Sequence, residues 1–398
     1  MKSVLYIRAD IGTKDLIAGG SVTHTLGVID GFIQHEYNVY CASSAMHALL
    51  YAKKNIVYIP LFVPQWCRCV GHKITSIISH IWFSYMIIVR MHRVHIDFVY
   101  QRYSMLNILG VIIARIKKKP LILEFNGSEV WVDEHWSPYK KIRLTWLVAW
   151  VERINITHAT RIVVVSEQLK EQLIMHGVQS AKIVVQSNGV DIDQFDPMRY
   201  AKERNQLRTL YGIQDYYVFG FIGSFSYWHG ITIISALMPR LLQKRPQVHF
   251  FLIGDGPLLE TLKKEVIEQG IQQRITFVGA VPYAASAGYL SACDAYLCPS
   301  QPNSDGTPFF GSPTKLFEYM SMGKPIIASA VGQLKEVVTP DIGFLVSHDD
   351  VDGFVHKAMQ LIDADDTIRN SLCAQARAKA VQKHSWKQHV YMIKQSLP

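Results

Sequence analysis

Short runs of apolar and β-branched residues alternate along the chain with longer stretches in which apolar residues recur at helical spacing. In the first half, seven runs fit buried parallel strands, at 3–7, 38–43, 55–60, 97–101, 120–125, 161–166 and 182–187. Amphipathic stretches such as 22–35, 106–116 and 139–156 separate them. Six further runs lie at 217–223, 249–254, 274–279, 294–300, 324–329 and 342–347. This order predicts an α/β fold with two doubly wound parallel sheets.

The alternation stops between the two series, where residues 187–213 carry turn residues and charge but no strand pattern. We therefore predict Rossmann-like domains at 1–186 and 187–375, facing each other across a cleft. The last segment, 376–398, contains a helix at 385–397 for which packing on the first domain is one possibility. Because ligands of open α/β sheets bind beyond the carboxyl ends of the strands, the strand-to-helix turns are the places to look for function.

The charge balance indicates an anionic partner: 41 Lys and Arg oppose 32 Asp and Glu, a formal net charge of +9. Phosphorylated small molecules and anionic lipids qualify. Nucleic acid is not expected, because no recognised basic and aromatic binding motif is present. Six scattered cysteines without framework spacing, and no signal peptide pattern at the start, predict a cytoplasmic protein.

Two features of the first half have competing interpretations. Cys67, Cys69 and His72 are spaced as metal ligands but lack a second ligand pair, so no metal site is expected. The helix-like run 74–89, with aromatic residues and flanking Arg90 and Arg93, suits a helix lying in a lipid interface. A buried helix of a large α/β domain explains the same run equally well.

The strongest chemical signal is the segment 313–329, PTKLFEYMSMGKPIIAS. Pro313 suits the first turn of a helix, whose free N–H groups at Thr314 and Lys315 would face an anion. A diphosphate fits there, since the helix dipole and the ammonium group both favour negative charge. Glu318, one turn further, could accept hydrogen bonds from ribose hydroxyls. The competing interpretation is that Lys315 and Glu318 are exposed helix charges.

This segment resembles the donor-binding signature of glycosyltransferase family 4, whose members are retaining enzymes with the two-domain GT-B fold. Glu318 matches the second glutamate of the family's Glu-x7-Glu pattern, which the resemblance implies to bind the donor ribose. Phe310 stands in place of the first glutamate, and Gly311 matches the glycine that follows it. Asp305, on the same loop, is the candidate to replace the missing sugar contact.

The resemblance continues in order through the second half. In 219–231, Gly223 ends a strand, while Ser224 and His229 stand near the places where the family presents an arginine and a lysine to the diphosphate. His229 can donate a hydrogen bond or a partial positive charge. Three further residues match donor-binding positions: Gly254 lies in a Gly-x-Gly-Pro turn, and Gly279 and Val281 lie where the family meets the base.

In the first half the resemblance implies a role for Gly20 beside the donor phosphates and acceptor. His24, expected in the first turn of the following helix, is either a ligand contact or a cap. Asn126 and Glu129 follow a strand and are candidates for acceptor or sugar contacts. The D-x-D at 191–193 is interpreted as linker, because it closes a domain rather than opening one.

These features predict a metal-independent hexosyltransferase with Lys315, His229 and Glu318 as catalytic residues. Its co-substrate is a nucleotide-diphosphate sugar, with no other cofactor, and its acceptor is a glycan or lipid-linked sugar in cell-surface polysaccharide synthesis. Peripheral membrane contact through the first domain is part of this prediction. The alternatives are a nucleotide-sugar epimerase, another GT-B enzyme, or an inactive nucleotide-binding homologue, which Phe310 and the missing Arg/Lys pair would suit.

Overall fold

The structure is a computed structural model that describes residues 2–10, 20–44, 55–63, 72–136, 145–303 and 306–397. The chain divides into two compact units. The first unit takes its described residues from 2–10, 25–187 and 387–397, and the second from 20–24 and 188–386. The units are therefore not two successive stretches of the chain. Residues 20–24 belong to the second unit although they precede most of the first, and residues 387–397 return to the first unit.

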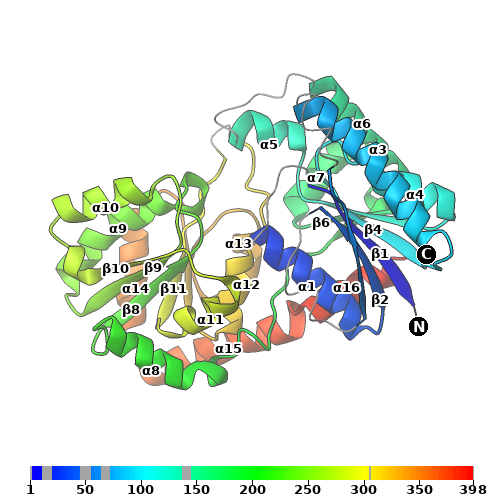
Figure 1. Cartoon of the computed structure of the whole chain (residues 1–398). Coiled ribbons are helices and arrows are strands. Elements are labelled where there is room, and N and C mark those ends of the chain that lie inside the picture. Colours follow the sequence, from blue (N-terminus) through cyan, green and yellow to red (C-terminus); the bar gives the residue numbers. More distant parts are fainter. Residues whose placement is uncertain are drawn as a thin grey trace. The chain divides into compact units, whose positions relative to one another are not determined.

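The first unit contains a seven-stranded parallel sheet (Figure 1). Its strands are β1 (Ser3–Arg8), β2 (Asn38–Ser43), β3 (Ile56–Pro60), β4 (Phe98–Arg102), β5 (Leu121–Phe125), β6 (Arg161–Val164) and β7 (Ile183–Val185). They lie in the order β3-β2-β1-β4-β5-β6-β7. Every residue of β1 and β5 is buried, as expected for strands of a parallel sheet that is covered on both faces. The charged residues Arg8 and Glu124 are buried with the apolar ones. All seven predicted strands are confirmed.

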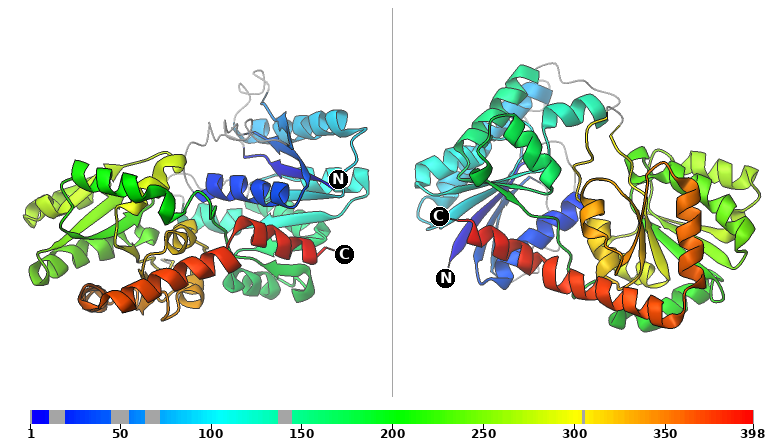
Figure 2. Two further views of the ribbon diagram at one scale, coloured as in Figure 1. Left: turned by 90° about the horizontal axis from the view of Figure 1, so that it is seen from below. Right: turned by 180° about the vertical axis from the view of Figure 1, so that it is seen from behind.

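Helices connect these strands. They are α1 (Gly20–Gln34), α3 (His72–Met91), α4 (Leu109–Lys117), α5 (Glu129–Trp136), α6 (Thr145–His158) and α7 (Glu167–Met175), joined by the C-terminal α16 (Trp386–Gln395). α4 contacts both α3 and α6, so these three helices form one layer, which the views in Figures 1 and 2 show. α16 is fastened to the first unit: the His35 ring nitrogen lies 2.9 Å from the carbonyl of Lys387, and Arg161 donates to the carbonyl of Ser396 at 2.7 Å.

The second unit is built on a six-stranded parallel sheet in the order β10-β9-β8-β11-β12-β13. The strands are β8 (Tyr217–Ile222), β9 (Val248–Ile253), β10 (Ile275–Gly279), β11 (Ala295–Cys298), β12 (Ile326–Ser329) and β13 (Gly343–Val346). They match the six predicted runs. The two sheets confirm the predicted α/β class with two doubly wound parallel domains.

Two hydrophobic clusters fill the faces of the second sheet. The helices are α8 (Ala201–Leu210), α9 (Ile231–Lys244), α10 (Leu259–Glu268), α11 (Tyr283–Ser291), α12 (Thr314–Ser321), α13 (Gly332–Val337), α14 (Val351–Asp363) and α15 (Asp366–Lys383). Residues of α9, α10 and α14 pack in one cluster, and residues of α11, α12 and α13 in the other. The predicted border at residue 375 falls inside α15, which continues to Lys383.

In each sheet the strand order reverses once, between β1 and β4 and between β8 and β11. At such a reversal the loops that leave the neighbouring strands run to opposite faces and leave room for a ligand. In the second unit these are the loop from β8 to α9 and the segment from β11 to α12, which carry most of the candidate residues.

The D-x-D at 191–193 shapes a turn. The carboxylate of Asp191 accepts the backbone N–H groups of Asp193 and Gln194 at 3.0 and 2.9 Å. Arg377 of α15 donates to the carbonyls of Ile192 and Phe195 at 2.9 and 2.8 Å. These bonds agree with the interpretation of this segment as a linker. Among the described helices, none is both long and apolar enough to span a bilayer.

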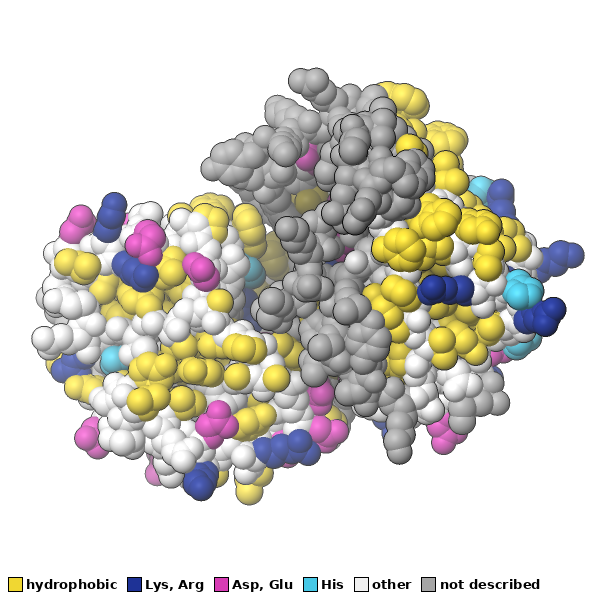
Figure 3. Space-filling model, in the orientation of Figure 1, with side chains coloured by type: hydrophobic (Ala, Val, Ile, Leu, Met, Phe, Trp, Pro, Cys, Tyr) yellow, Lys and Arg dark blue, Asp and Glu magenta, His cyan; other side chains and the backbone are white. Residues whose placement is uncertain are grey.

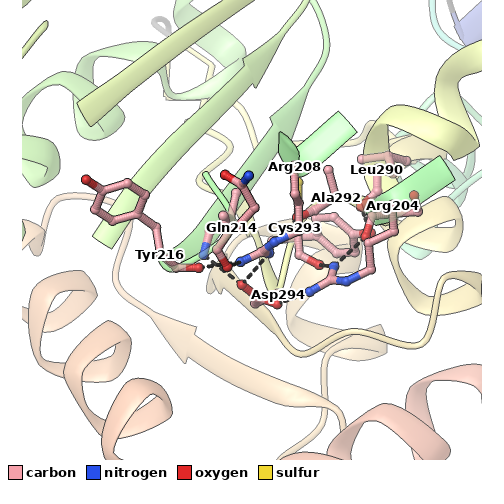
Figure 4. Close-up of polar contacts among 11 residues, drawn as sticks. Arg204, Arg208, Gln214, Tyr216, Leu290, Ala292, Cys293 and Asp294 are labelled. Atoms are coloured by element: carbon pink, nitrogen blue, oxygen red, sulfur yellow. Dashed lines mark hydrogen bonds and ion pairs between the residues drawn. The ribbon is translucent and has the colours of Figure 1, made fainter. Parts of the chain in front are cut away.

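An ion-pair network around the buried Arg208 braces the amino-terminal edge of the second sheet (Figure 4). Asp294, just before β11, accepts from Arg208 at 3.1 Å and from the backbone N–H of Val218 at 2.8 Å, and it also pairs with Arg204. Arg208 donates further to the carbonyls of Ala292, at 2.9 Å, and Tyr216, at 2.6 Å. Because this cluster lies at the edge opposite the ligand edge, its role is structural.

Removing one partner of this network leaves a buried guanidinium without its counter-charge. Asp294→Ala should therefore destabilise the second unit by about 3 kcal/mol, measured as a lower urea midpoint by tryptophan fluorescence. The control is Asp352→Ala, which removes an exposed ion pair with Arg240; the Asp352 side chain is 80% exposed. That loss should stay under about 0.5 kcal/mol. Equal shifts in the two variants would contradict the structural role.

Candidate functional site

Glycines let two loops meet at the carboxyl edge of the second sheet. A Cβ on Gly254 would lie 1.9 Å from the carbonyl oxygen of Gly223, and one on Gly256 would lie 2.6 Å from the nitrogen of Phe225. All three glycines also have positive φ angles, between 134° and 158°. Side chains at these positions would clash, so the turns after β8 and β9 depend on glycine.

The loop after β8 also touches the loop after β11. A Cβ on Gly230, which has a φ of 72°, would lie 1.7 Å from the carbonyl oxygen of Pro299. The backbone N–H of Gln301 donates to the carbonyl of Trp228 at 3.1 Å. These contacts hold a single 3-10 turn, Tyr227–His229, at the point where the strand order reverses.

The N-terminus of α12 opens onto this place without a side-chain cap. Pro313 is the N-cap residue, one position before the first helical turn in which the sequence placed it, and it makes no side-chain cap hydrogen bond. Because proline has no polar side chain, it cannot cap the N–H groups of Thr314 and Lys315, which are therefore the ones that can meet a ligand. The N–H of Leu316 donates to the carbonyl of Pro313 at 3.0 Å. Gly20 of α1 lies close, since a Cβ there would be 3.5 Å from the Thr314 hydroxyl. Ser312 accepts the backbone N–H of Asn188 at 3.0 Å, which fixes the approach to the helix.

Lys315 is a buried lysine, 6% exposed, whose ammonium nitrogen has no hydrogen-bond partner among the described residues. The nitrogen lies 4.2 Å from the centroid of the Phe221 ring and 2.9 Å from the position that a Cβ of Gly223 would take. Burial lowers the pKa of Lys315 to about 8. The contact with the aromatic face compensates only part of the lost hydration.

Glu318 lies one turn further along α12 and is also buried, 6% exposed. Burial raises its pKa to about 7, while the charge of Lys315 opposes that rise. Both residues are therefore buried at the turn rather than exposed on the helix surface, which excludes the competing interpretation from the sequence.

His229 does not provide the partial positive charge expected of it. Burial, and next the charge of Lys315, hold its pKa far below its ordinary value. The imidazole is consequently neutral at physiological pH and can act only as a hydrogen-bond donor or acceptor.

The remaining candidates of the second unit take different positions. Ser224 is exposed, with its hydroxyl 2.9 Å from the position of a Gly256 Cβ. Gly279 has a φ of 83° and open space where a side chain would be, and Val281 packs partly against the core. Phe310 is buried. Gly311 lies close to the Phe309 ring, since a Cβ on Gly311 would be 2.9 Å from that ring. Asp305 lies outside the described residues.

The carboxyl edge of the first sheet carries a hydrogen-bonded polar network centred on Glu124, which is 1% exposed. Glu124 accepts from Asn126 at 2.5 Å and from Tyr100 at 3.0 Å, and it forms an ion pair with Arg102 of the neighbouring strand. Asn126 is thus committed to Glu124 through its amide. Glu129 begins α5, where burial, then the charges of Asp10 and Glu152, raise its pKa to about 7.

Sequence reasoning missed Arg8, the last residue of β1. Its guanidinium donates to Asp10 at 2.7 Å and to Thr25 of α1 at 2.7 Å. The available signal was a charged residue at the end of an otherwise uncharged strand, and Arg102 stands at the same end of the adjacent β4. His24 is the fifth residue of α1, buried edge-to-face against Trp386 with ring centroids 5.2 Å apart, so it is not an N-terminal cap.

The sequence matches family models in both units. Residues 18–194 match the model described as Glycosyltransferase Family 4, and residues 216–364 match that described as Glycosyl transferases group 1. Together with the two Rossmann-like sheets, these matches define a glycosyltransferase of the GT-B class. The chain belongs to glycosyltransferase family 4.

Curated relatives agree with this assignment. A GDP-mannose-dependent phosphatidylinositol monomannoside mannosyltransferase of Corynebacterium glutamicum is 28% identical over 155 residues, 39% of this chain and 40% of that protein. A UDP-Gal:alpha-D-GlcNAc-diphosphoundecaprenol alpha-1,3-galactosyltransferase of Escherichia coli is 24% identical over 84% of this chain and 82% of that one. The matched segments span 40% to 59% of the first four relatives.

Solved structures share the whole fold. Anabaena HepE in complex with UDP superposes with a TM-score of 0.72 over 100% of both chains at 19% identity. Sucrose-phosphate synthase from Thermosynechococcus elongatus gives a TM-score of 0.73, with 99% of this chain and 98% of that one covered, also at 19% identity.

The two shifted pKa values predict a bell-shaped pH dependence for the binding of a nucleotide sugar. Above a pH of about 8, Lys315 loses its positive charge and attracts the diphosphate less. Below a pH of about 7, Glu318 takes up a proton and accepts hydroxyl hydrogen bonds poorly. Affinity, measured by calorimetry with UDP-glucose and GDP-mannose, should peak between these values.

Two conservative variants assign the limbs of this profile. Lys315→Arg keeps its charge at all these pH values and should remove the alkaline decline. Glu318→Gln cannot titrate and should remove the acidic decline. A profile that both variants leave unchanged would mean that neither residue meets the ligand.

Proposed function

We propose that this protein transfers a hexose from a nucleotide-diphosphate sugar to a glycan or lipid-linked acceptor in cell-surface polysaccharide synthesis, on the cytoplasmic side of a membrane. The observation that carries the proposal is the buried ammonium group of Lys315, which has no hydrogen-bond partner among the described residues and lies at an uncapped helix N-terminus. A buried, unpaired cation is costly, and a bound anion relieves that cost.

The donor is held by three kinds of group in this proposal. The first N–H groups of α12 and the Lys315 ammonium bind the diphosphate, as helix N-termini and ammonium groups bind phosphates elsewhere. Glu318, one turn deeper, accepts hydrogen bonds from the ribose hydroxyls. The glycine turns at Gly223 and Gly254 let the loops after β8 and β9 pack together beside Lys315 at the same edge.

The reaction breaks the bond between the anomeric carbon and the diphosphate oxygen, and the electron pair leaves with the diphosphate. Lys315 and the helix N–H groups stabilise that developing charge from fixed positions. Neutral His229 contributes a hydrogen bond rather than a charge. We propose that the acceptor hydroxyl attacks from the side of the leaving group and gives its proton to the departing oxygen, so that configuration is retained.

The carboxyl edge of the first sheet is proposed to bind the acceptor. Glu129 has a pKa near neutrality there, and Arg8 with Arg102 adds two guanidinium groups that are already paired. Relatives named for undecaprenyl-diphosphate-linked and phosphatidylinositol-linked acceptors support a lipid-linked substrate.

An inactive nucleotide-binding homologue remains the second candidate, because Phe310 and Ser224 replace charged residues of the family pattern. Acceptor-dependent release of the nucleotide from a nucleotide sugar distinguishes the two. An epimerase would turn over the donor without any acceptor, and a binding protein would not turn it over at all.

Lys315→Ala and Glu318→Ala should each weaken nucleotide-sugar binding or turnover by about tenfold or more, the scale of a lost charge-assisted hydrogen bond. Binding is measured by calorimetry and turnover by release of the nucleoside diphosphate. The controls are Lys335→Ala and Glu268→Ala, which remove exposed charges of the same unit. Wild-type binding and rates in both site variants would defeat the assignment.

Transfer should continue in the presence of a chelator, since the cation that faces the leaving group in this proposal is Lys315. The measurement is the initial rate with and without excess EDTA, after dialysis against it. Activity that disappears with EDTA and returns with Mg²⁺ or Mn²⁺ would overturn metal independence.

A further inference from the structure

One face of α3 exposes a stripe of large apolar side chains. Ile81, Tyr85 and Val89 are 67%, 57% and 48% exposed, and their spacing of four residues places them on one side of the helix. The opposite side is core, since Phe83 and Ile87 are both fully buried. The helix therefore packs one side into the core of the domain and leaves an apolar side exposed.

Aromatic contacts extend the stripe beyond α3. The ring of Trp82 lies 5.6 Å from that of Tyr85 and 6.4 Å from that of Phe62, which follows β3 and is 54% exposed. Within the same helical layer, α6 exposes Trp146 and Trp150, by 68% and 57%. Tryptophan and tyrosine are the residues that favour the boundary between lipid and water.

Positive charge flanks these side chains at one end of the helical layer. Residues 72–119 contain eight Lys or Arg but only one acidic residue, Asp97. Arg90, Arg93, Arg115 and Lys118 are exposed at the C-terminal ends of α3 and α4. Lys117 serves the fold instead, donating to the carbonyls of His92 and Val94 at 3.0 and 3.2 Å.

Figure 3 shows hydrophobic side chains gathered over the part of the first unit where Figure 1 places α3 and α6, with Lys and Arg side chains beside them. Exposed apolar groups flanked by cations are complementary to an anionic bilayer, into whose headgroups the apolar groups insert. A protein partner would need acidic side chains to match the same cations.

We infer that the face formed by α3, α4 and α6, called here the docking face, binds the surface of a membrane that contains anionic lipids. The inference rests on the proposed function in one respect: membrane binding would bring the protein to a lipid-linked acceptor. Membrane binding itself requires neither donor nor transfer.

The test is co-sedimentation of the full-length protein with vesicles of phosphatidylglycerol and phosphatidylethanolamine, against vesicles of phosphatidylcholine alone. The wild type should bind the anionic vesicles and release as salt is raised. Each exposed arginine near a bilayer is worth about fivefold in partitioning, so Arg90→Gln with Arg93→Gln should weaken binding by at least about tenfold. Ile81→Ser with Tyr85→Ser, and Trp146→Ser with Trp150→Ser, should do the same.

Matched controls lie in the second unit. Met198 and Leu210 are 84% and 73% exposed, so Met198→Ser with Leu210→Ser removes comparable apolar surface outside the docking face. Lys202→Gln with Lys264→Gln removes two exposed charges there. Both controls should bind vesicles as the wild type does.

The inference is overturned if the wild type ignores anionic vesicles, if docking-face variants bind them normally, or if the controls lose binding equally. It is also overturned if ultracentrifugation finds a wild-type dimer that the Ile81 and Tyr85 changes dissociate, because the face then binds a second copy. Stabilisation by UDP-glucose or GDP-mannose in a thermal shift should survive every docking-face variant. Loss of that signal alone would count against the donor site and not against the docking face.

Discussion

The burial of one ammonium group shapes the functional half of this molecule. Lys315 lies against the face of Phe221 and the bare backbone of Gly223, with no hydrogen-bond partner among the described residues. Such an arrangement costs free energy that the rest of the fold must offset. Arg377 holds the other end of the helix, donating to the carbonyl and hydroxyl of Ser321 at 2.9 and 2.6 Å. These bonds anchor the C-terminal end of α12.

Charges around this group restrict one another. Burial and then the charge of Lys315 lower the pKa of His229, while burial raises the pKa of Glu318 and the charge of Lys315 opposes that rise. The charge of Lys315 therefore depends on the ligand. A bound diphosphate adds negative charge beside the lysine and favours its protonated form. In the proposed reaction the same charge then meets the leaving group, so binding and catalysis draw on one interaction.

The carboxyl edges of the two sheets are prepared in different ways. At the first, Glu124 is satisfied by Arg102, Asn126 and Tyr100, and such a complete network rigidifies its surroundings. At the second, the N-terminus of α12 has no side-chain cap, and the Lys315 ammonium has no hydrogen-bond partner among the described residues. A rigid edge suits positioning of an acceptor, whereas an electrostatically incomplete edge suits an anion that arrives and leaves.

The sequence by itself determined the thirteen strands, the parallel α/β class and the glycine turns, because these depend on local patterns of apolar residues and on backbone freedom. It also indicated Lys315 and Glu318, since a proline, a lysine and a glutamate at helical spacing form one recognisable device. The partners of these residues were decided only by the tertiary structure. Phe221 and Lys315 are distant in sequence, and so are Arg102 and Glu124, and no local pattern records which distant side chains meet. The same holds for α3, whose periodicity fixed a helix but whose neighbours decided that one side is core and the other is exposed.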